Sequence, residues 1–281
     1  MNVSLVDTHC HLDAAEFGDT QAILVRDAQA VGVACIVVPS VARDNFGSVR
    51  ELCARFPGCA PAYGIHPMYT DNAVPDDLAV LRDYLQQHSP VAVGEIGLDF
   101  FINHYNQARQ EYFFVEQLKL AREFNLPILL HIRRAQDIIL KHLRHFYGRG
   151  GSSTTLRTGI AHAFNGSRQQ ADEFIKLGFK LGFGGAMTYS RATRLRELAA
   201  TLPLDSIVLE TDAPDIPPDF LARGQPNKSE YIPRIAQTLA GLRGITPEAV
   251  ARATTANALA AVPHLANYNR ASQLQVKQHG H

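Results

Sequence analysis

The chain has 281 residues, which is near the usual length of a single α/β barrel and sufficient to bury a full core. Its 27 basic and 27 acidic residues balance, so no net positive charge is available to hold duplex DNA tightly without sequence preference. The start of the chain does not resemble a signal peptide, and no stretch stays apolar for about 18 residues, so we expect a cytoplasmic protein without a membrane span. The four cysteines lack C-x-x-C spacing, which predicts reduced thiols.

Apolar runs alternate with segments of helical periodicity along the chain. The apolar runs predict strands near residues 3–6, 33–38, 59–65, 90–94, 126–130, 158–161, 179–183 and 206–209. The periodic segments predict helices near residues 20–31, 43–56, 76–88, 107–124, 135–147, 168–177, 192–201, 231–242 and 247–260. Residues 148–155 are rich in glycine and serine and predict a loop.

Eight strands that are each followed by a helix predict an α/β protein with a closed (β/α)8 TIM barrel. An open, doubly wound sheet is the competing architecture, although no G-x-G-x-x-G follows any of the predicted strands. We see no domain boundary, and we therefore place one domain at residues 1–262. A polar tail follows at residues 263–281.

The segment Asp7-Thr8-His9-Cys10-His11 ends the first predicted strand. Side chains two residues apart on a strand point to the same face, so His9 and His11 would aim two imidazoles at one point. Imidazole is the commonest metal ligand in proteins, although two polar residues that merely close a strand are the alternative. Cys10 could be a third ligand, but on a strand it would point away from both histidines, which favours packing.

Further candidate ligands stand where later strands end. In a parallel barrel all strands end on one face, and the active site lies there. The candidate ligands at these ends are His9, His11, Glu95, His131, His162 and Asp212. Taken singly, Glu95 could cap a turn and Asp212 could form an Asx turn.

Together these four imidazoles and two carboxylates exceed what one tetrahedral site needs, and they suit two divalent ions that share a ligand. A carboxylate has two oxygens and can bridge two ions, and we assign that role to Glu95. We expect Asp212 to bind one ion and to accept the proton of the attacking water.

Other residues at the same face are candidates for holding an anionic substrate. Arg133 follows His131 by two residues, and its guanidinium could bind a phosphate through two hydrogen bonds. A structural ion pair is the alternative for Arg133. His66 and Asn165 could donate to the same oxygens, and Gly184-Gly185 would let the backbone approach a ligand closely.

These motifs, in this order from about Val3 to Leu259, resemble the TatD family of metal-dependent hydrolases and deoxyribonucleases, and a YjjV-like branch in particular. The matching segments are Asp7-Thr8-His9-Cys10-His11-Leu12-Asp13, Gly64-Ile65-His66-Pro67, Gly94-Glu95-Ile96-Gly97-Leu98-Asp99, His131-Ile132-Arg133, His162-Ala163-Phe164-Asn165-Gly166-Ser167 and Glu210-Thr211-Asp212-Ala213-Pro214. Ser229 stands where relatives often have proline, which we expect to affect only a loop.

The resemblance implies an amidohydrolase-like barrel with two divalent metal ions per subunit. In this sequence His9, His11, Glu95 and Asp212 would bind one ion, and Glu95, His131 and His162 would bind the other. His66 and Arg133 match positions near the substrate phosphate. Mixed histidine and carboxylate ligands accept Zn, Mg, Mn, Ni or Co, so the sequence leaves the metal open.

The implied activity is hydrolysis of phosphodiester bonds at DNA ends, often as a 3′→5′ exonuclease. A second hypothesis keeps the fold and the metal centre but acts on a small-molecule ester or amide, or on an aminoacyl ester of RNA. A third is a scaffold protein with a dead barrel, which would have lost a ligand, and none is missing here. We expect a monomer because no interface stripe stands out in the sequence.

Overall fold

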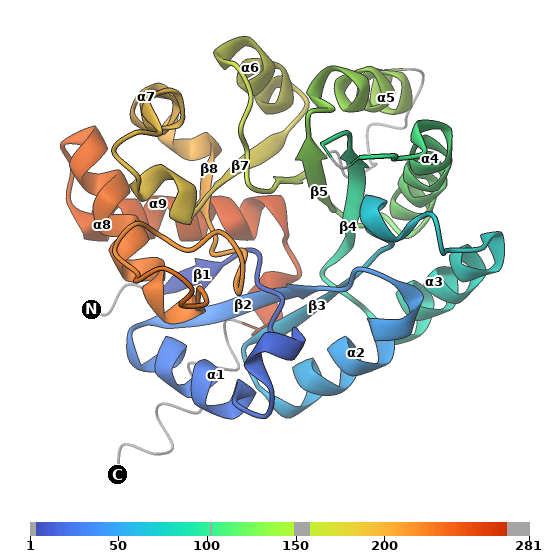
Figure 1. The fold of residues 1–281 in the computed structure, drawn as a ribbon, viewed down its shortest axis with the longest axis horizontal. Helices are drawn as coiled ribbons and strands as arrows, with labels where there is room; N and C mark the ends of the chain where they lie inside the picture. The colour runs from blue at the N-terminus through green and yellow to red at the C-terminus, as the bar shows by residue number, and fades with distance from the viewer. Residues whose placement is uncertain (1–3, 102, 149–157, 269–281) are drawn as a thin grey trace. The chain divides into compact units, whose positions relative to one another are not determined.

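A computed structural model describes residues 4–101, 103–148 and 158–268. Eight strands form one sheet whose order follows the sequence from β1 to β8, and all the pairings resolved between them are parallel (Figure 1). A doubly wound sheet reverses its strand order at a switch point, and this sheet has no such reversal. The predicted (β/α)8 TIM-barrel fold is confirmed, and the doubly wound alternative is wrong.

The elements alternate as the sequence predicted. The strands are β1 (Leu5–Asp7), β2 (Val33–Pro39), β3 (Cys59–Tyr63), β4 (Ala92–Asp99), β5 (Ile128–Arg133), β6 (Gly159–Ala161), β7 (Phe179–Phe183) and β8 (Ile207–Leu209). The α-helices are α1 (Gln21–Ala30), α2 (Phe46–Arg55), α3 (Pro75–His88), α4 (Gln107–Glu123), α5 (Gln136–Gly148), α6 (Arg168–Lys176), α7 (Thr193–Thr201), α8 (Ile232–Arg243) and α9 (Pro247–Ala261). Most of the predicted loop at residues 148–155 lies outside the described residues.

The chain divides into two compact units. The described residues of Met1–Val38, Glu51–Ala60 and Gly182–His281 make up the first, and Pro39–Arg50 with Pro61–Leu181 make up the second. The prediction of one domain at residues 1–262 stays a prediction. The polar tail predicted at residues 263–281 also stays a prediction. Leu265 within it is fully buried, and residues 269–281 lie outside the described part of the chain.

In the first unit, β1 pairs with β2 in parallel, with Val6 opposite Cys35. The hydroxyl of Thr255 in α9 donates to the carbonyl of Ser4, just before β1. Helix α8 ends at Arg243, and the left-handed backbone (φ 64°) of the next residue, Gly244, suits a glycine that caps the helix. These contacts fix the strand that leads into the histidine pair.

In the second unit, β4 and β5 lie side by side over a long register, from Val93 opposite Ile128 to Asp99 opposite Arg133 (Figure 1). All eight residues of β4 are buried, as expected for a strand covered on both faces. Helix α4 packs against β4 and buries the side chains predicted to face the core, which are Phe113, Phe114, Leu118 and Ala121.

Strands β4 and β5 run further than the sequence indicated. The predicted fourth strand stopped at residue 94, where glycines interrupt the apolar run, but pairing with β5 carries the strand on to Asp99. Glu95 and His131 therefore lie inside strands, where ladder hydrogen bonds hold their backbones. In contrast β1 ends at Asp7, so His9 and His11 follow the strand instead of belonging to it.

Two predictions from composition have structural counterparts. In the described residues, no helix combines the length and the apolar character needed to span a membrane. All four cysteines fall within the described chain, where they are buried and form no disulfide with one another.

Candidate metal centre

The first cluster of candidate ligands lies in the first unit and contains His9, His11 and Asp212. The Nε2 atoms of the two histidines are 3.3 Å apart, and Oδ1 of Asp212 is 3.7 Å from each of them. His9 is fully buried, while His11 and Asp212 keep 19% and 15% of their side chains exposed. A buried cluster with one open side can hold an ion and still admit a substrate.

Backbone pairing brings these three residues together. The Asp212 amide donates to the carbonyl of His9 (2.8 Å), and the His11 amide donates to the carbonyl of Ala213 (2.8 Å). Cys10, between the histidines, forms an isolated parallel bridge with Ala213. Asp212 adopts a left-handed backbone (φ 59°), which aspartate accepts more readily than most residues. The histidines thus converge although they lie beyond the end of β1.

A buried carboxylate that the sequence analysis did not single out organises this cluster. Asp7 Oδ1 accepts hydrogen bonds from the amides of Thr211 (3.0 Å) and His9 (3.3 Å). Its Oδ2 accepts from the hydroxyls of Thr211 (2.6 Å) and Ser229 (2.6 Å). Burial raises the pKa of Asp7 to about 7, although these four donors oppose the rise. Ser229 therefore does more than shape a loop.

The second cluster lies in the second unit and centres on Glu95. Its Oε1 is 2.8 Å from Nδ1 of His131, 3.4 Å from Nε2 of His162 and 3.5 Å from Nε2 of His66. The Glu95 side chain is only 2% exposed. One buried carboxylate oxygen thus faces three imidazoles, which is an unusual concentration of ligand atoms for a protein interior.

His131 lies between two carboxylates. Its Nδ1 faces Glu95, and its Nε2 is 3.0 Å from Oδ2 of Asp99. Burial lowers the pKa of His131, but the hydrogen bonds to Asp99 and Glu95 outweigh it and raise this pKa above its usual value. An ionised carboxylate only accepts, so both ring nitrogens donate, Nε2 to Asp99 and Nδ1 to Glu95. A divalent ion that binds Nδ1 would replace the proton there, while Nε2 keeps its bond to Asp99.

Asp99 is itself held firmly. Its Oδ1 accepts from the amide of Phe101 (2.8 Å), and its own amide donates to Oε1 of Gln110 (2.9 Å). Burial would raise the pKa of Asp99, but the hydrogen bonds from His131 and Phe101 outweigh it and hold this pKa below its usual value. Asp99 therefore stays ionised and fixes the orientation of the His131 ring.

His66 differs from the other histidines of the second cluster. Its Nδ1 accepts a hydrogen bond from the amide of Met68 (3.1 Å), so the neutral ring carries its proton on Nε2. That nitrogen then faces Glu95 as a donor and has no lone pair to offer to an ion. This geometry favours the predicted role of His66 as a donor to a substrate oxygen over a role as a ligand.

The spacing of the ligand atoms fits divalent metal ions. Nitrogen and oxygen ligands about 2.0–2.2 Å from a tetrahedral ion lie about 3.3–3.6 Å from one another. The separations of 3.3 and 3.7 Å in the first cluster and of 3.4 Å between Glu95 and His162 are close to this range, whereas the 2.8 Å between Glu95 and His131 is a hydrogen-bond distance. Imidazoles and carboxylates are also the donor set that such ions prefer.

The remaining candidate residues have distinct surroundings. Arg133 is exposed at the end of β5, and its charge acts on the carboxylate of Asp99, so phosphate binding and a structural ion pair both stay predictions for it. Its guanidinium lies 3.7 Å from the centre of the Phe101 ring. Asn165 is exposed beyond β6, and its role in substrate binding stays a prediction. Cys10 is buried and is not among the clustered ligands of the described residues.

The sequence analysis missed Asp7 and Asp99 as functional residues. Both carboxylates are fully buried, and both bond to a candidate ligand, Asp7 to the amide of His9 and Asp99 to the ring of His131. The available signal was an acidic residue in each ligand-bearing motif, two residues before His9 and four residues after Glu95. The spacing of these acidic residues in the sequence did not show which candidate ligand each of them would bond to.

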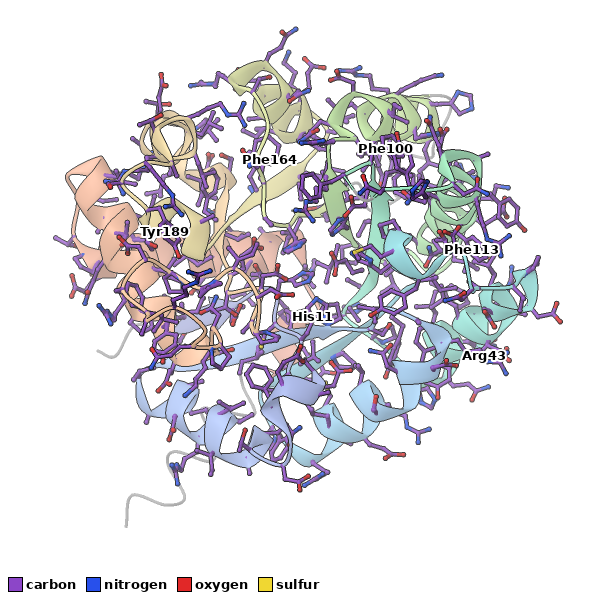
Figure 2. All side chains as sticks on the ribbon, viewed as in Figure 1. His11, Arg43, Phe100, Phe113, Phe164 and Tyr189 are labelled. Carbon is purple, nitrogen blue, oxygen red and sulfur yellow. The ribbon has the colours of Figure 1, made fainter. Side chains whose placement is uncertain are left out.

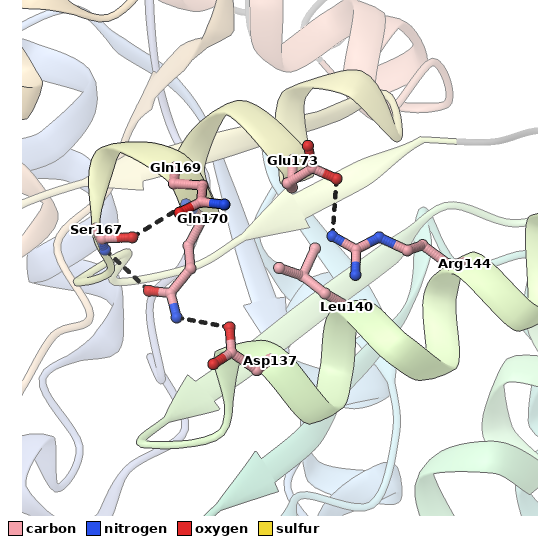
Figure 3. Close-up of a pocket in the computed structure, with 7 residues that line it drawn as sticks. All are labelled: Asp137, Leu140, Arg144, Ser167, Gln169, Gln170 and Glu173. Carbon is pink, nitrogen blue, oxygen red and sulfur yellow. Dashed lines mark hydrogen bonds and ion pairs between the residues drawn. The ribbon is translucent and has the colours of Figure 1, made fainter.

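A separate pocket lies outside these clusters, between α5 and α6 (Figure 3). It is lined by Asp137, Leu140, Arg144, Ser167, Gln169, Gln170 and Glu173. The amide of Gln170 donates to Asp137 (2.8 Å), and Arg144 pairs with Glu173 (2.7 Å). Its polar groups thus satisfy one another and present no set of converging ligand atoms, so the two histidine clusters are the better candidate site.

Comparison with known proteins gives consistent matches over nearly the whole chain. The family model described as TatD related DNase matches residues 6–262. The uncharacterised metal-dependent hydrolase YjjV of Escherichia coli K12 is 41% identical over 255 residues, which cover 90% of this chain and 95% of that protein. The 3′-5′ ssDNA/RNA exonuclease TatD of Erwinia billingiae is 32% identical and is covered to 97%.

A solved structure agrees with these matches. The crystal structure of YjjV, a TatD homologue from Escherichia coli K12, superposes with a TM-score of 0.87 at 37% identity. The superposition covers 94% of this chain and 99% of that one. Barrels of more distant hydrolases, such as molinate hydrolase at 14% identity and a TM-score of 0.56, share the fold alone.

Proposed function

Because the chain belongs to the TatD family and is a metal-dependent hydrolase, we propose that it hydrolyses phosphodiester bonds at the ends of DNA, as a 3′→5′ exonuclease. The observation that carries the proposal is the first cluster, in which Asp212 lies 3.7 Å from both histidine nitrogens and is still partly exposed. The exonuclease activity printed for the Erwinia relative supports the choice of substrate. We further propose that the protein acts as a monomer in the cytoplasm.

We assign the metal ligands to the two clusters, one divalent ion to each. His9, His11 and Asp212 would hold the first. Glu95, His131 and His162 would hold the second, because Oε1 of Glu95 lies 2.8 Å from His131 and 3.4 Å from His162. Ions bound by these residues would lower the pKa of water and polarise the phosphate. The sharing of Glu95 between the two ions remains a prediction from the sequence.

The side chains of the protein supply the other steps. Asp212 accepts the proton that the attacking water loses. Arg133, which is exposed, donates to a non-bridging phosphate oxygen. His66 adds a second donor through Nε2. Attack on phosphorus breaks the bond to the leaving sugar oxygen, which gains a proton from water.

The test uses single-stranded DNA labelled at the 3′ or the 5′ end, with protein reconstituted with Mg, Mn or Zn. We expect laddering from the 3′ end that EDTA abolishes. Asp212→Ala should lower the rate by about 10²–10⁴-fold, because it removes a proton acceptor as well as a ligand. Asp219→Ala is the matched control, since Asp219 is an exposed carboxylate of the same loop.

Two results would contradict the proposal. Unchanged activity in Asp212→Ala would refute the assignment of the proton acceptor. Absence of cleavage with every metal would refute the nuclease, and simple esters, amides and aminoacyl-RNA would then be the substrates to screen. The chain has equal numbers of acidic and basic residues, so its net charge does not favour DNA over these other substrates.

A further inference from the structure

An exposed aromatic ring lies next to the second cluster. Phe101 directly follows Phe100, which is labelled in Figure 2, and it is 44% exposed. Two guanidinium groups lie over its ring, that of Arg133 at 3.7 Å from the ring centre and that of Arg134 at 4.5 Å. Both arginines are exposed.

The backbone beneath this ring is fixed to the candidate metal ligands. The amide of Phe101 donates to Asp99 Oδ1 (2.8 Å), and the other oxygen of Asp99 bonds to His131. The amide of Phe100 donates to the carbonyl of Arg133 (2.8 Å). One buried carboxylate therefore positions both the imidazole of His131 and the segment that carries the exposed ring.

We propose that Phe101, Arg133 and Arg134 form a stacking subsite for one unpaired nucleobase of a single-stranded nucleic acid. The proposal rests on the proposed function, and it adds how the strand is held. Non-specific sites for single strands combine aromatic rings, on which bases stack, with cationic groups that follow the backbone. The three side chains supply both parts at one place.

Charge and geometry select this occupant. Each guanidinium is planar and stacks on an aromatic face, while its N–H groups remain free to donate to a phosphate. The two arginines bring two positive charges to one ring in a chain whose net charge is zero. A duplex keeps its bases stacked inside, so the subsite admits single strands and excludes paired ends.

Binding is measured by fluorescence anisotropy with a nuclease-resistant probe and metal-loaded protein. The probe is a fluorescein-labelled phosphorothioate strand of eight thymidylates, and the comparison strand has the same backbone without bases. Phe101→Ala should weaken binding of the thymidylate strand by about 5- to 150-fold, as expected for the loss of one stacked base. Binding of the abasic strand should not change, and Phe101→Trp should retain both affinities.

Tyr112→Ala is the matched control. Tyr112 lies on α4 and is 45% exposed, almost the same as Phe101, so its removal tests whether any exposed ring has the same effect. We expect no change in this variant. Arg134→Gln should weaken binding and lower the slope of the logarithm of affinity against the logarithm of salt concentration by about 0.7, the value for one phosphate contact on a single strand.

Equal affinity of Phe101→Ala and the wild type for thymidylates would overturn the subsite, and so would an equal loss on the abasic strand. A failure of the proposed nuclease activity would give a different combination of binding and cleavage results. If binding depends on Phe101 and on bases but unmodified DNA is never cut, the subsite stands and the proposed reaction is wrong. If DNA is cut at the same rate with and without the Phe101 ring, the reaction stands and the subsite is wrong.

Discussion

Replacing Asp99 by asparagine tests whether a buried carboxylate sets the proton position on His131. The carboxamide of Asp99→Asn would keep one acceptor oxygen for the Phe101 amide, so its NH2 group would face Nε2 of His131. Two donors cannot face each other, so the proton of the ring moves to Nδ1. The ring proton then lies on Nδ1, which faces Glu95 at 2.8 Å, so Nδ1 has no lone pair to offer to an ion.

The expected cost follows from this exchange. Removing the partner of a metal-ligating histidine lowers metal affinity by about 10- to 100-fold, which corresponds to about 1.4–2.7 kcal/mol. We expect Asp99→Asn to lose this factor for the ion of the second cluster. The affinity of the first cluster should not change, because Asp99 bonds to none of its ligands.

Competition with a metallochromic chelator measures the two affinities, and long-range ¹⁵N–¹H spectra report which nitrogen of His131 carries the proton. Asp44→Asn makes the same chemical change at an exposed carboxylate and serves as the control. A folded Asp99→Asn protein with unchanged metal affinity and an unchanged His131 proton position would refute the reasoning.

Three further predictions concern stability. Ser229→Ala removes a donor from the buried carboxylate of Asp7 and should lower the free energy of unfolding by about 1–3 kcal/mol, measured by urea denaturation. Gly97→Ala drives a methyl group into the carbonyl oxygen of His131 at φ 154°, and should lower it by about 2–6 kcal/mol. Burial raises the pKa of Glu111, but hydrogen bonds outweigh burial and hold this pKa below its usual value. The Tm of the wild type should therefore exceed that of Glu111→Gln by less as the pH falls from about 7 to about 3.

Controls match the first two changes. Ser48→Ala removes a hydroxyl that bonds to a carbonyl at the surface, and it should be neutral. Gly241→Ala adds a methyl group where no atom lies within 4 Å, and it should leave the protein as stable or slightly more so. A Tm difference for Glu111→Gln that grows on acidification would contradict the sign given above.

The fold was predictable because its signal is local. Continuous apolar runs and helical periodicity are properties of short windows, and they placed the eight strands within a few residues. The errors fall where the signal is not local. Strand β4 continues past Gly94 because β5 supplies hydrogen bonds as far as Arg133, and no window around Gly94 contains that partner.

The candidate site was predictable where the type of side chain by itself indicates metal binding. The pair His9 and His11, and a histidine or carboxylate at several later strand ends, indicated metal ions before any geometry was known. The supporting groups were not predictable in the same way. Asp7 bonds to residues 204 and 222 positions away, and a carboxylate with so distant a partner looks like any other acidic residue in the sequence.

The separation of Asp7 from Thr211 in the sequence determines when the first cluster can form during synthesis. A ribosome that adds about 5–20 residues per second needs about 10–40 s to make the chain between Asp7 and Thr211. Throughout that interval the nascent chain has both histidines of the first cluster but neither Asp212 nor the hydroxyls that bind Asp7. The first cluster is therefore among the last parts of the molecule to form, and a truncated chain that ends before residue 211 carries two of its three ligands.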